Sequence, residues 1–153
     1  MEVYRICLTK YAGELYASGI RGRWNSKGNF IIYTAGSRAL ACLENVVHRS
    51  GEGLSYNFRT VVISIPDDVT VESISADELP VNWQQVKSYP VCQALGNDWY
   101  RQLKSAVLCV PSSIIPEEYN YILNTRHPDF AKIRIKGSEN FIFDPRIKDD
   151  LLG

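Results

Sequence analysis

Short apolar and β-branched runs, separated by turn-forming residues, recur along the 153-residue chain and predict several β-strands. The runs predict strands over residues 3–7, 30–34, 60–65 and 106–110. The β-branched run at 60–65 is typical of a strand that is covered on both faces. Two later runs, at 132–135 and 141–143, predict a hairpin that turns across Gly137 and Ser138.

The clearest helical pattern covers residues 37–49, with Ser37 as a suitable N-cap and Gly51 as a stop signal just after it. An apolar stripe at spacing i, i+3 and i+7 predicts the buried face of this helix: Leu40, Leu43 and Val47. Glu44 lies beside the stripe and one turn before His48. We therefore expect Glu44 at the edge of the core instead of in open solvent.

Weaker helical patterns cover residues 83–87 and 92–104, and Pro90 and Gly96 interrupt them. A proline at a first helical position predicts another short helix over 116–120. Strands and helices follow each other without a regular β-α-β alternation. This mixture favours an α+β fold, a small mixed or antiparallel β-structure with packed helices, over a doubly wound sheet.

The composition fits one globular domain, residues 1–153, that is long enough to bury a substantial core. Seventeen basic and seventeen acidic residues give a formal net charge of zero, whereas a protein that coats nucleic acid usually has a basic excess. The sequence shows neither a signal-peptide pattern at its start nor an apolar run of membrane-spanning length. These features predict a cytoplasmic protein.

The four cysteines lie far apart in apolar stretches and form no Cys-x-x-Cys pair: Cys7, Cys42, Cys92 and Cys109. With only two histidines in the chain, this spacing gives no support to a zinc site. We interpret the cysteines as small buried hydrophobic residues in a reducing compartment, and we expect no metal.

A cation and an aromatic ring stand close together in the first third of the sequence. Arg23 follows a glycine and precedes Trp24, and a guanidinium can bind a phosphate with two parallel hydrogen bonds. The alternative is a surface arginine that stacks on Trp24 or pairs with a carboxylate. Tyr33 ends a predicted strand, where its ring could stack on a planar heterocycle or simply be a half-buried strand tyrosine.

Three further side chains could take part in chemistry. Glu44 could activate a nucleophile or stabilise an oxocarbenium ion by its charge, or it could form an internal ion pair with Arg5 or Arg38. His48 could move a proton or complement the dipole at a helix C-terminus. Ser112 could bind a phosphate or a ribose hydroxyl, or it could cap a turn.

Taken in order, these residues resemble the RES-domain toxins of bacterial RES/Xre type II toxin–antitoxin pairs. The resemblance covers nearly the whole chain and is carried by a collinear set of short motifs: Tyr4-Arg5-Ile6, Gly22-Arg23-Trp24-Asn25, Ile32-Tyr33-Thr34-Ala35, Leu43-Glu44, Val46-Val47-His48, Leu79-Pro80, Gly96-Asn97-Asp98-Trp99, Val107-Leu108-Cys109-Val110-Pro111-Ser112, Asn120-Tyr121, Asn124, His127-Pro128 and Phe143-Asp144-Pro145-Arg146. Two positions depart from the family pattern. Arg21 stands where a second glycine is frequent, and Thr125-Arg126 replaces the proline that usually follows the asparagine at 124.

The resemblance implies an ADP-ribosyltransferase-like fold and an enzyme that consumes NAD⁺ by hydrolysis, by phosphorolysis or by ADP-ribose transfer to a protein. NAD⁺ would be the substrate, with no separate cofactor. The resemblance implies catalytic roles for Arg23, Tyr33 and Glu44. It also implies NAD⁺ contacts by these three residues and by four others: Trp24, His48, Ser112 and Asn124.

The same resemblance implies a partner, an Xre-type antitoxin that covers the active site. Neither membrane association nor direct binding to nucleic acid is expected, and DNA would be reached only through the antitoxin. Two readings from other classes stay open on the sequence. One is an RNA-directed toxin that uses basic residues near Trp24 as a stacking platform. The other is a non-catalytic binding protein in which the arginine and the glutamate are structural.

Overall fold

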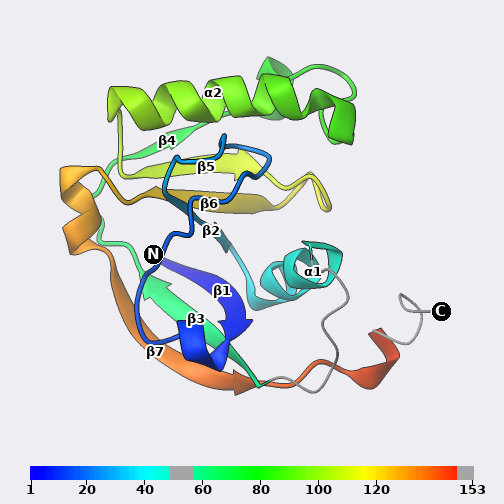
Figure 1. Ribbon diagram of the computed structural model, residues 1–153, viewed down its shortest axis with the longest axis vertical. Helices are drawn as coiled ribbons and strands as arrows, with labels where there is room; N and C mark the ends of the chain where they lie inside the picture. Colours follow the sequence, from blue (N-terminus) through cyan, green and yellow to red (C-terminus); the bar gives the residue numbers. More distant parts are fainter. Residues whose placement is uncertain (49–56, 148–153) are drawn as a thin grey trace.

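A single seven-stranded sheet organises the chain (Figure 1). The computed structural model describes residues 1–48 and 57–147, and the side chain of His48 lies outside this description. The strands are β1 (Glu2–Leu8), β2 (Ile31–Ala35), β3 (Phe58–Ser64), β4 (Val71–Ser73), β5 (Val107–Pro111), β6 (Tyr119–Asn124) and β7 (Arg134–Phe141). The two long α-helices are α1 (Arg38–His48) and α2 (Tyr89–Gln102), and residues 145–147 are also helical. The 3-10 helices are η1 (Thr9–Tyr11), η2 (Ala76–Glu78), η3 (Val86–Ser88) and η4 (Pro128–Lys132).

The strand order β4-β5-β6-β2-β1-β3-β7 makes the sheet mixed, because β4 and β5 are parallel whereas the other neighbours are antiparallel. The pairing between β2 and β1 is short, and its register is given by one residue pair, Tyr4 and Ala35. By contrast, β1 pairs with β3 along its full length. The expected α+β class is therefore confirmed, and the sheet consists of two halves that meet at one point.

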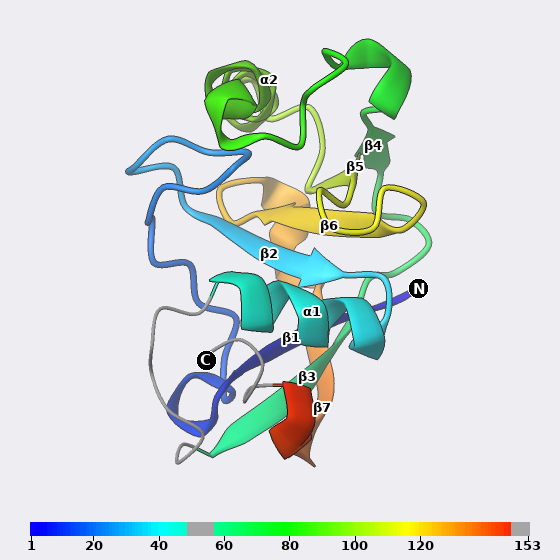
Figure 2. The same ribbon diagram turned by 90° about the vertical axis from the view of Figure 1, so that its right-hand side faces the viewer.

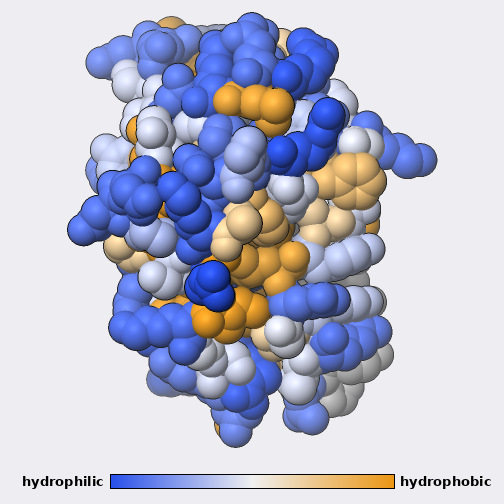
Figure 3. Space-filling model, turned by 90° about the vertical axis from the view of Figure 1, so that its left-hand side faces the viewer, coloured by the Kyte–Doolittle hydropathy of each residue, from blue (hydrophilic) through white to orange (hydrophobic). Residues whose placement is uncertain are grey.

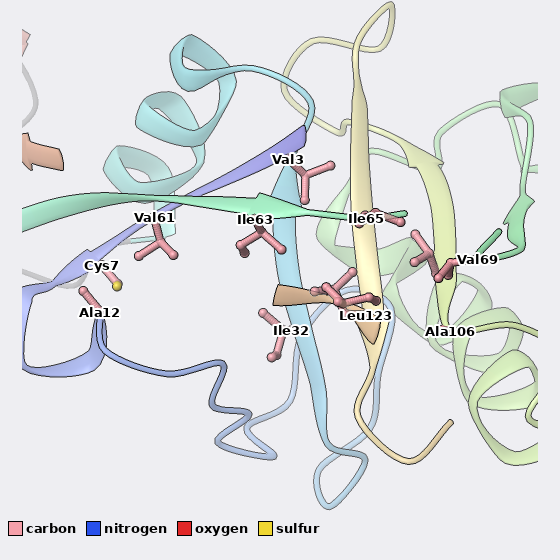
Figure 4. Packing of buried hydrophobic residues seen from close by; sticks show 12 residues of the cluster. Val3, Cys7, Ala12, Ile32, Val61, Ile63, Ile65, Val69, Ala106 and Leu123 are labelled. Atoms are coloured by element: carbon pink, nitrogen blue, oxygen red, sulfur yellow. The ribbon is translucent and has the colours of Figure 1, made fainter. Parts of the chain in front are cut away.

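Side chains alternate between the two faces of each strand, so strand parity assigns each residue to a face. One face carries a core of aliphatic residues from five strands, together with residues from loops (Figure 4). Irregular segments and η4 cover this core instead of an α-helix, through side chains such as Ala12, Val69 and Phe130. Figure 3 shows the molecule from the side on which η4 lies, where apolar surface gathers in the middle of a hydrophilic rim.

Both α-helices pack on the opposite face (Figure 2). Ile31 and Tyr33 join a cluster with Cys92, Trp99 and Tyr100 of α2. A second cluster joins residues of β1, β2 and β3 to α1: Ile6, Ala35, Leu40, Ala41 and Phe58. Strand β2 therefore passes under α2 with its first residues and meets α1 with its last residue.

The predicted helix at 37–49 is present as α1, although Arg49 and Gly51 lie outside the described residues. The N-cap is confirmed, since the backbone N–H of Leu40 donates to Oγ of Ser37 over 3.1 Å. The predicted apolar stripe is wrong at two positions, because Leu43 and Val47 are exposed. The helix instead turns Leu40 and Ala41 toward the sheet, and Glu44, four residues after Leu40, is half-buried on that side.

The strands predicted near 3–7, 30–34, 60–65 and 106–110 are confirmed as β1, β2, β3 and β5. The predicted hairpin across Gly137 is wrong, because β7 continues through this glycine, with a register shift beside it, and pairs with β3 on both sides of the shift. The predicted helix at 116–120 is also wrong, because β6 begins at Tyr119 and pairs with strands on both sides. The interruption expected at Pro90 and Gly96 is absent from α2, where Pro90 lies in the first turn and has no N–H to leave unpaired.

All four cysteines are free thiols, with Cys7 and Cys92 buried and the other two half-buried. Burial raises the pKa of each thiol. This agrees with their interpretation as small hydrophobic residues. In the part of the chain that is described, no helix combines the length and the apolar character that a membrane crossing requires.

Candidate active site

The segment that precedes β2 is folded around one buried amide, that of Asn25. Its Nδ2 donates to three backbone carbonyls, those of Ile20 at 2.9 Å and of Ser26 and Asn29 at 3.2 Å each. The backbone of Gly22 bridges that of Asn25 as well. One side chain therefore closes the loop that carries Arg23.

The hydroxyl of Tyr33 fastens this loop to the sheet. It donates to Oδ1 of Asn25 over 2.6 Å and accepts the backbone N–H of Trp24 over 3.0 Å. A Cβ atom on Gly22 would lie 2.5 Å from this hydroxyl, so the close approach requires a glycine. Burial raises the pKa of the Tyr33 phenol, and the nearby Arg23 offsets only part of this rise. Tyr33 therefore remains a neutral hydrogen-bond donor in neutral solution.

Helix α2 supports the loop from the other side. A Cβ on Gly96 would lie 1.9 Å from the carbonyl oxygen of Trp24, so the helix can approach only because residue 96 is a glycine. One turn earlier, Nε2 of Gln93 donates to the carbonyl of Gly22 over 2.8 Å. Oδ1 of Asn97 accepts the backbone N–H of Ser26 over 3.0 Å. Because these contacts lie one turn apart, the loop follows the axis of α2.

Arg23 points away from Trp24, toward the segment that leads into α2. Its two terminal nitrogens donate to the carbonyls of Trp83 and Gln84, each over 2.7 Å. The guanidinium carbon lies 4.5 Å from the centroid of the Tyr89 ring and 5.8 Å from that of Trp83. The alternative in which Arg23 stacks on Trp24 is therefore excluded, since the Trp24 ring is buried in the α2 cluster and Arg23 stacks on Tyr89.

Glu44 and Ser112 lie 68 residues apart in the sequence and meet in space. Oγ of Ser112 donates to Oε1 of Glu44 over 3.2 Å. Ser112 follows the last residue of β5 and is fully buried, whereas Glu44 on α1 is half-buried. Arg38, the partner considered for Glu44, pairs with Glu139 over 2.8 Å instead. The other arginine considered, Arg5, donates to the carbonyl of Tyr16 over 3.2 Å.

The Glu44–Ser112 pair and Tyr33 lie along the same face of the sheet. Neighbouring rows of paired residues across β2, β6 and β5 show this relation: Tyr33–Ile122–Leu108, and then Ala35–Asn120–Val110. Ser112 comes two residues after Val110, and each step of two residues advances about 6.6 Å along a strand. Ser112, which donates to Glu44, is therefore two such steps along the strands and two strand spacings across the sheet from Tyr33.

Asn120 belongs to the second of these rows and was not assigned a role from the sequence. Its Nδ2 donates to the carbonyl of Thr34 over 3.2 Å, and its side chain is half-buried between the rows of Tyr33 and Ser112. One sequence signal for it was the Asn120-Tyr121 motif of the family resemblance, and a polar residue within a strand was the other signal. That signal was hidden because this segment was predicted to be a helix.

Three predicted contact residues lie apart from this group or outside it. Asn124 is fully buried at the other end of β6, where its amide donates to the carbonyl of Tyr100 and accepts the N–H of Arg126. Trp24 offers a backbone N–H to Tyr33, but its ring belongs to the core. The side chain of His48 is outside the described part of the structure.

The arrangement supplies a fixed cation, a neutral phenol and a carboxylate to one side of the sheet. The guanidinium can bind an anion, the tyrosine ring can stack on a planar heterocycle, and the carboxylate can stabilise a developing positive charge. Among residues 1–48 and 57–147, no three His, Cys, Asp or Glu side chains gather in a way that could hold a metal ion.

Comparison with known proteins gives a consistent result. A family model described as RES domain matches residues 2–144. A relative named Prs ADP-ribosylating toxin, from Sphingobium sp. (strain YBL2), is 40% identical over 144 residues, which cover 91% of this chain and 89% of that protein. A relative named Toxin Res, from Yersinia enterocolitica, is 33% identical over 153 residues, which cover 97% of this chain and 100% of that protein.

A solved structure shares the fold. It is the crystal structure of the M. tuberculosis MbcT–MbcA toxin–antitoxin complex, in which one chain superimposes with a TM-score of 0.72 at 19% identity. The match covers 98% of this chain and 87% of that chain. With a family model over nearly the whole length and relatives above 30% identity, the chain belongs to the RES domain family.

Proposed function

We propose that this protein is the toxin of a toxin–antitoxin pair and that it breaks the bond between nicotinamide and ribose in NAD⁺ in the cytoplasm. Membership of the RES domain family and the names of its relatives support the toxin role. The observation that carries the chemical part is the position of Glu44, which Ser112 holds on the same face of the sheet as Tyr33.

The reaction suits a site that lacks a strong acid. When the glycosidic C–N bond breaks, its electron pair returns to the pyridinium nitrogen and nicotinamide leaves as a neutral molecule. Positive charge then develops on the ribose, where the Glu44 carboxylate stabilises it. Tyr33, which burial keeps protonated, presents its ring to the nicotinamide and takes no proton in this step. Water then adds to the ribose carbon and releases its proton to the solvent, or an oxygen of inorganic phosphate adds in its place.

Arg23 binds the diphosphate or the ribose next to nicotinamide. Two of the five N–H donors of its guanidinium are used by the carbonyls of Trp83 and Gln84. These bonds and the Tyr89 ring hold the guanidinium plane, so little side-chain entropy is lost when an anion binds to the remaining donors. Ser112 acts through Glu44 in this scheme, while Trp24 and Asn124 contribute to the scaffold.

Protein ADP-ribosylation is the second candidate. The relative that is 40% identical to this chain is named an ADP-ribosylating toxin, and this name favours transfer to a protein. The bond that breaks is the same in both reactions, and they differ only in the nucleophile that adds to the ribose. The proposed site would therefore be shared, and the acceptor decides between the two functions.

The partner of a toxin of this kind is an antitoxin. The MbcT–MbcA structure is a toxin–antitoxin complex with the same fold, and it supports an antitoxin partner for this chain as well. We propose an Xre-type antitoxin that covers the face between α1 and α2. The RNA-directed alternative loses its main feature, since the Trp24 ring is buried and offers no stacking surface.

The direct experiment is to incubate the purified protein with NAD⁺ and to follow nicotinamide release by chromatography. We expect Glu44→Ala and Arg23→Ala to lower the rate at least about a hundredfold, because the first removes the anion that stabilises the positive ribose and the second removes the cation that holds the substrate in place. The exposed residues Glu14 and Arg101 provide matched controls, and Glu14→Ala and Arg101→Ala should retain the wild-type rate. If all four variants consume NAD⁺ equally fast, the assignment of the site fails.

The acceptor is identified in the same assay. Mass spectrometry of the products with and without inorganic phosphate separates hydrolysis from phosphorolysis. Biotin-labelled NAD⁺ added with a bacterial lysate reports transfer, because only transfer leaves the label on a protein. A rate of nicotinamide release that does not exceed the uncatalysed rate under any of these conditions would exclude the proposed reaction.

A further inference from the structure

We propose that Ser112 is a positioning residue that orients Glu44 and does not itself contact NAD⁺. This inference rests on the proposed function and refines it, because the family resemblance alone suggests a substrate contact for Ser112. The argument depends on how completely the Ser112 hydroxyl is used within the protein.

A serine hydroxyl offers one donor and two acceptor positions. The hydroxyl of Ser112 accepts the backbone N–H groups of Ile114 and Ile115, each over 3.1 Å. These two bonds fill its acceptor positions, so its proton points to the remaining neighbour, Oε1 of Glu44 at 3.2 Å. The residue is also fully buried. A phosphate or a ribose hydroxyl would have to displace one of these three partners.

The backbone around Ser112 is fixed by its own loop. The N–H of Ser112 donates to the carbonyl of Glu118 over 2.9 Å, and the N–H of Glu118 donates to the carbonyl of Ile115 over 2.9 Å. Both ends of the segment also continue into paired strands, β5 before it and β6 after it. The segment from 112 to 118 is therefore a closed turn, and Ser112 cannot move without breaking it.

The same turn is tied to the start of α1, the helix that carries Glu44. Oγ of Ser37 donates to Oε1 of Glu118 over 3.1 Å while it accepts the N–H of Leu40. The N–H of Gly36 donates to the carbonyl of Tyr119 over 3.0 Å. These contacts join the turn and the helix into one unit. The turn therefore fixes the position of the Ser112 hydroxyl, and its contacts with the start of α1 fix the position of the helix that carries Glu44.

A held carboxylate has a direct consequence for the proposed reaction. Charge stabilisation depends on the position of the carboxylate relative to the ribose, and a displacement of about 1 Å can cost a hundredfold in rate. Ser112 restricts the rotation of the Glu44 side chain before the substrate arrives. We therefore expect its loss to affect the bond-breaking step and to leave substrate affinity nearly unchanged.

The test compares Ser112→Ala with the wild type in NAD⁺ consumption. We expect kcat to fall at least about tenfold, with KM for NAD⁺ and the dissociation constant of ADP-ribose, measured by calorimetry, within about twofold of wild type. Ser113→Ala is the matched control, since the adjacent Ser113 hydroxyl makes no hydrogen bond within the described residues. A KM or ADP-ribose constant that rises about tenfold, with kcat unchanged, would show a substrate contact and overturn the proposal.

A double-mutant cycle shows whether Ser112 acts through Glu44. In the Glu44→Gln background, Ser112→Ala should change kcat by less than about twofold, because the group that it orients is already altered. A full additional loss in that background would contradict the proposal. An inactive wild-type protein would instead reject the proposed function, so the two failures are distinguishable.

Should Ser112→Ala fail to fold, Ser37→Ala decides the question. This change loosens the tie between the turn and α1 at the half-buried N-cap of the helix and leaves Ser112 intact. A lower kcat with unchanged KM supports the positioning role, and an unchanged kcat overturns it.

Discussion

The hydroxyl of Tyr33 donates to Oδ1 of Asn25 over 2.6 Å. This bond joins β2 to the loop that presents Arg23, because the same amide holds three carbonyls of the loop through its nitrogen. Asn25 therefore determines the position of two residues of the proposed site and touches neither the reacting atoms nor the solvent. It is a scaffold residue on which the site depends.

We expect Asn25→Ala to lower the free energy of unfolding by about 2–4 kcal/mol, since it leaves the proton of the buried Tyr33 hydroxyl without its acceptor and removes the buried amide that joins three carbonyls of the loop. Nicotinamide release should fall as well. Urea denaturation measures the free energy of unfolding. Asn57→Ala, at an exposed asparagine, should change stability by less than about 0.5 kcal/mol. Equal stability of the two variants would contradict the role of Asn25.

Gly96 determines how closely α2 approaches the loop. Alanine usually favours a helix over glycine by about 1 kcal/mol. At this position, however, its Cβ would lie 1.9 Å from the carbonyl of Trp24. We therefore expect Gly96→Ala to destabilise the protein by about 1–3 kcal/mol, because the helix must move away. In thermal unfolding, Gly137→Ala is the control, since a Cβ at Gly137 meets nothing within 4 Å.

Arg23→Lys separates charge from geometry. Lysine keeps the positive charge but cannot donate in a fork to the carbonyls of Trp83 and Gln84 or lie flat on the Tyr89 ring. We expect at least about a tenfold loss in kcat/KM for NAD⁺. Arg21 is exposed and lies 5.6 Å from the same ring, so Arg21→Lys is a close control and should be near wild type. Comparable rates for both variants would show that charge alone is sufficient at residue 23.

Tyr33 predicts a decline of stability in alkaline solution. Burial raises its pKa above the ordinary value of about 10. Below about pH 10, the folded and the unfolded protein both keep the phenol proton, and the contribution of Tyr33 to the free energy of unfolding is complete. As the pH rises further, the unfolded chain releases the proton while the folded protein retains it, so the free energy of unfolding falls.

The effect is measured as the slope of the free energy of unfolding against pH above about 10. This slope should be shallower in Tyr33→Phe. In the control Tyr119→Phe, at an exposed tyrosine, it should match the wild type. A Tyr33→Phe slope as steep as that of the wild type would contradict the assignment.

Local sequence patterns were sufficient for elements whose residues carry their own signal. The β-branched and aromatic runs predicted β1, β2, β3 and β5, and Ser37 marked the start of α1. They failed for β6, in which polar and apolar residues follow a proline-led turn. That segment becomes a strand because β5 and β2 both offer it a free edge. The hairpin predicted at Gly137 failed for a related reason. The pairing of β7 with β3 keeps the chain extended at this glycine.

The sequence by itself determined which side chains this protein has for chemistry: a cation at Arg23, a ring at Tyr33 and a carboxylate at Glu44, each on a short element of its own. Only the tertiary structure decided how they are held. Ser112 reaches Glu44 across 68 residues, and Arg23 turns from its neighbour Trp24 to the carbonyls of Trp83 and Gln84. The physical reason is that propensity and spacing act over a few residues, whereas hydrogen-bond partners are chosen by strand pairing and helix packing between distant segments.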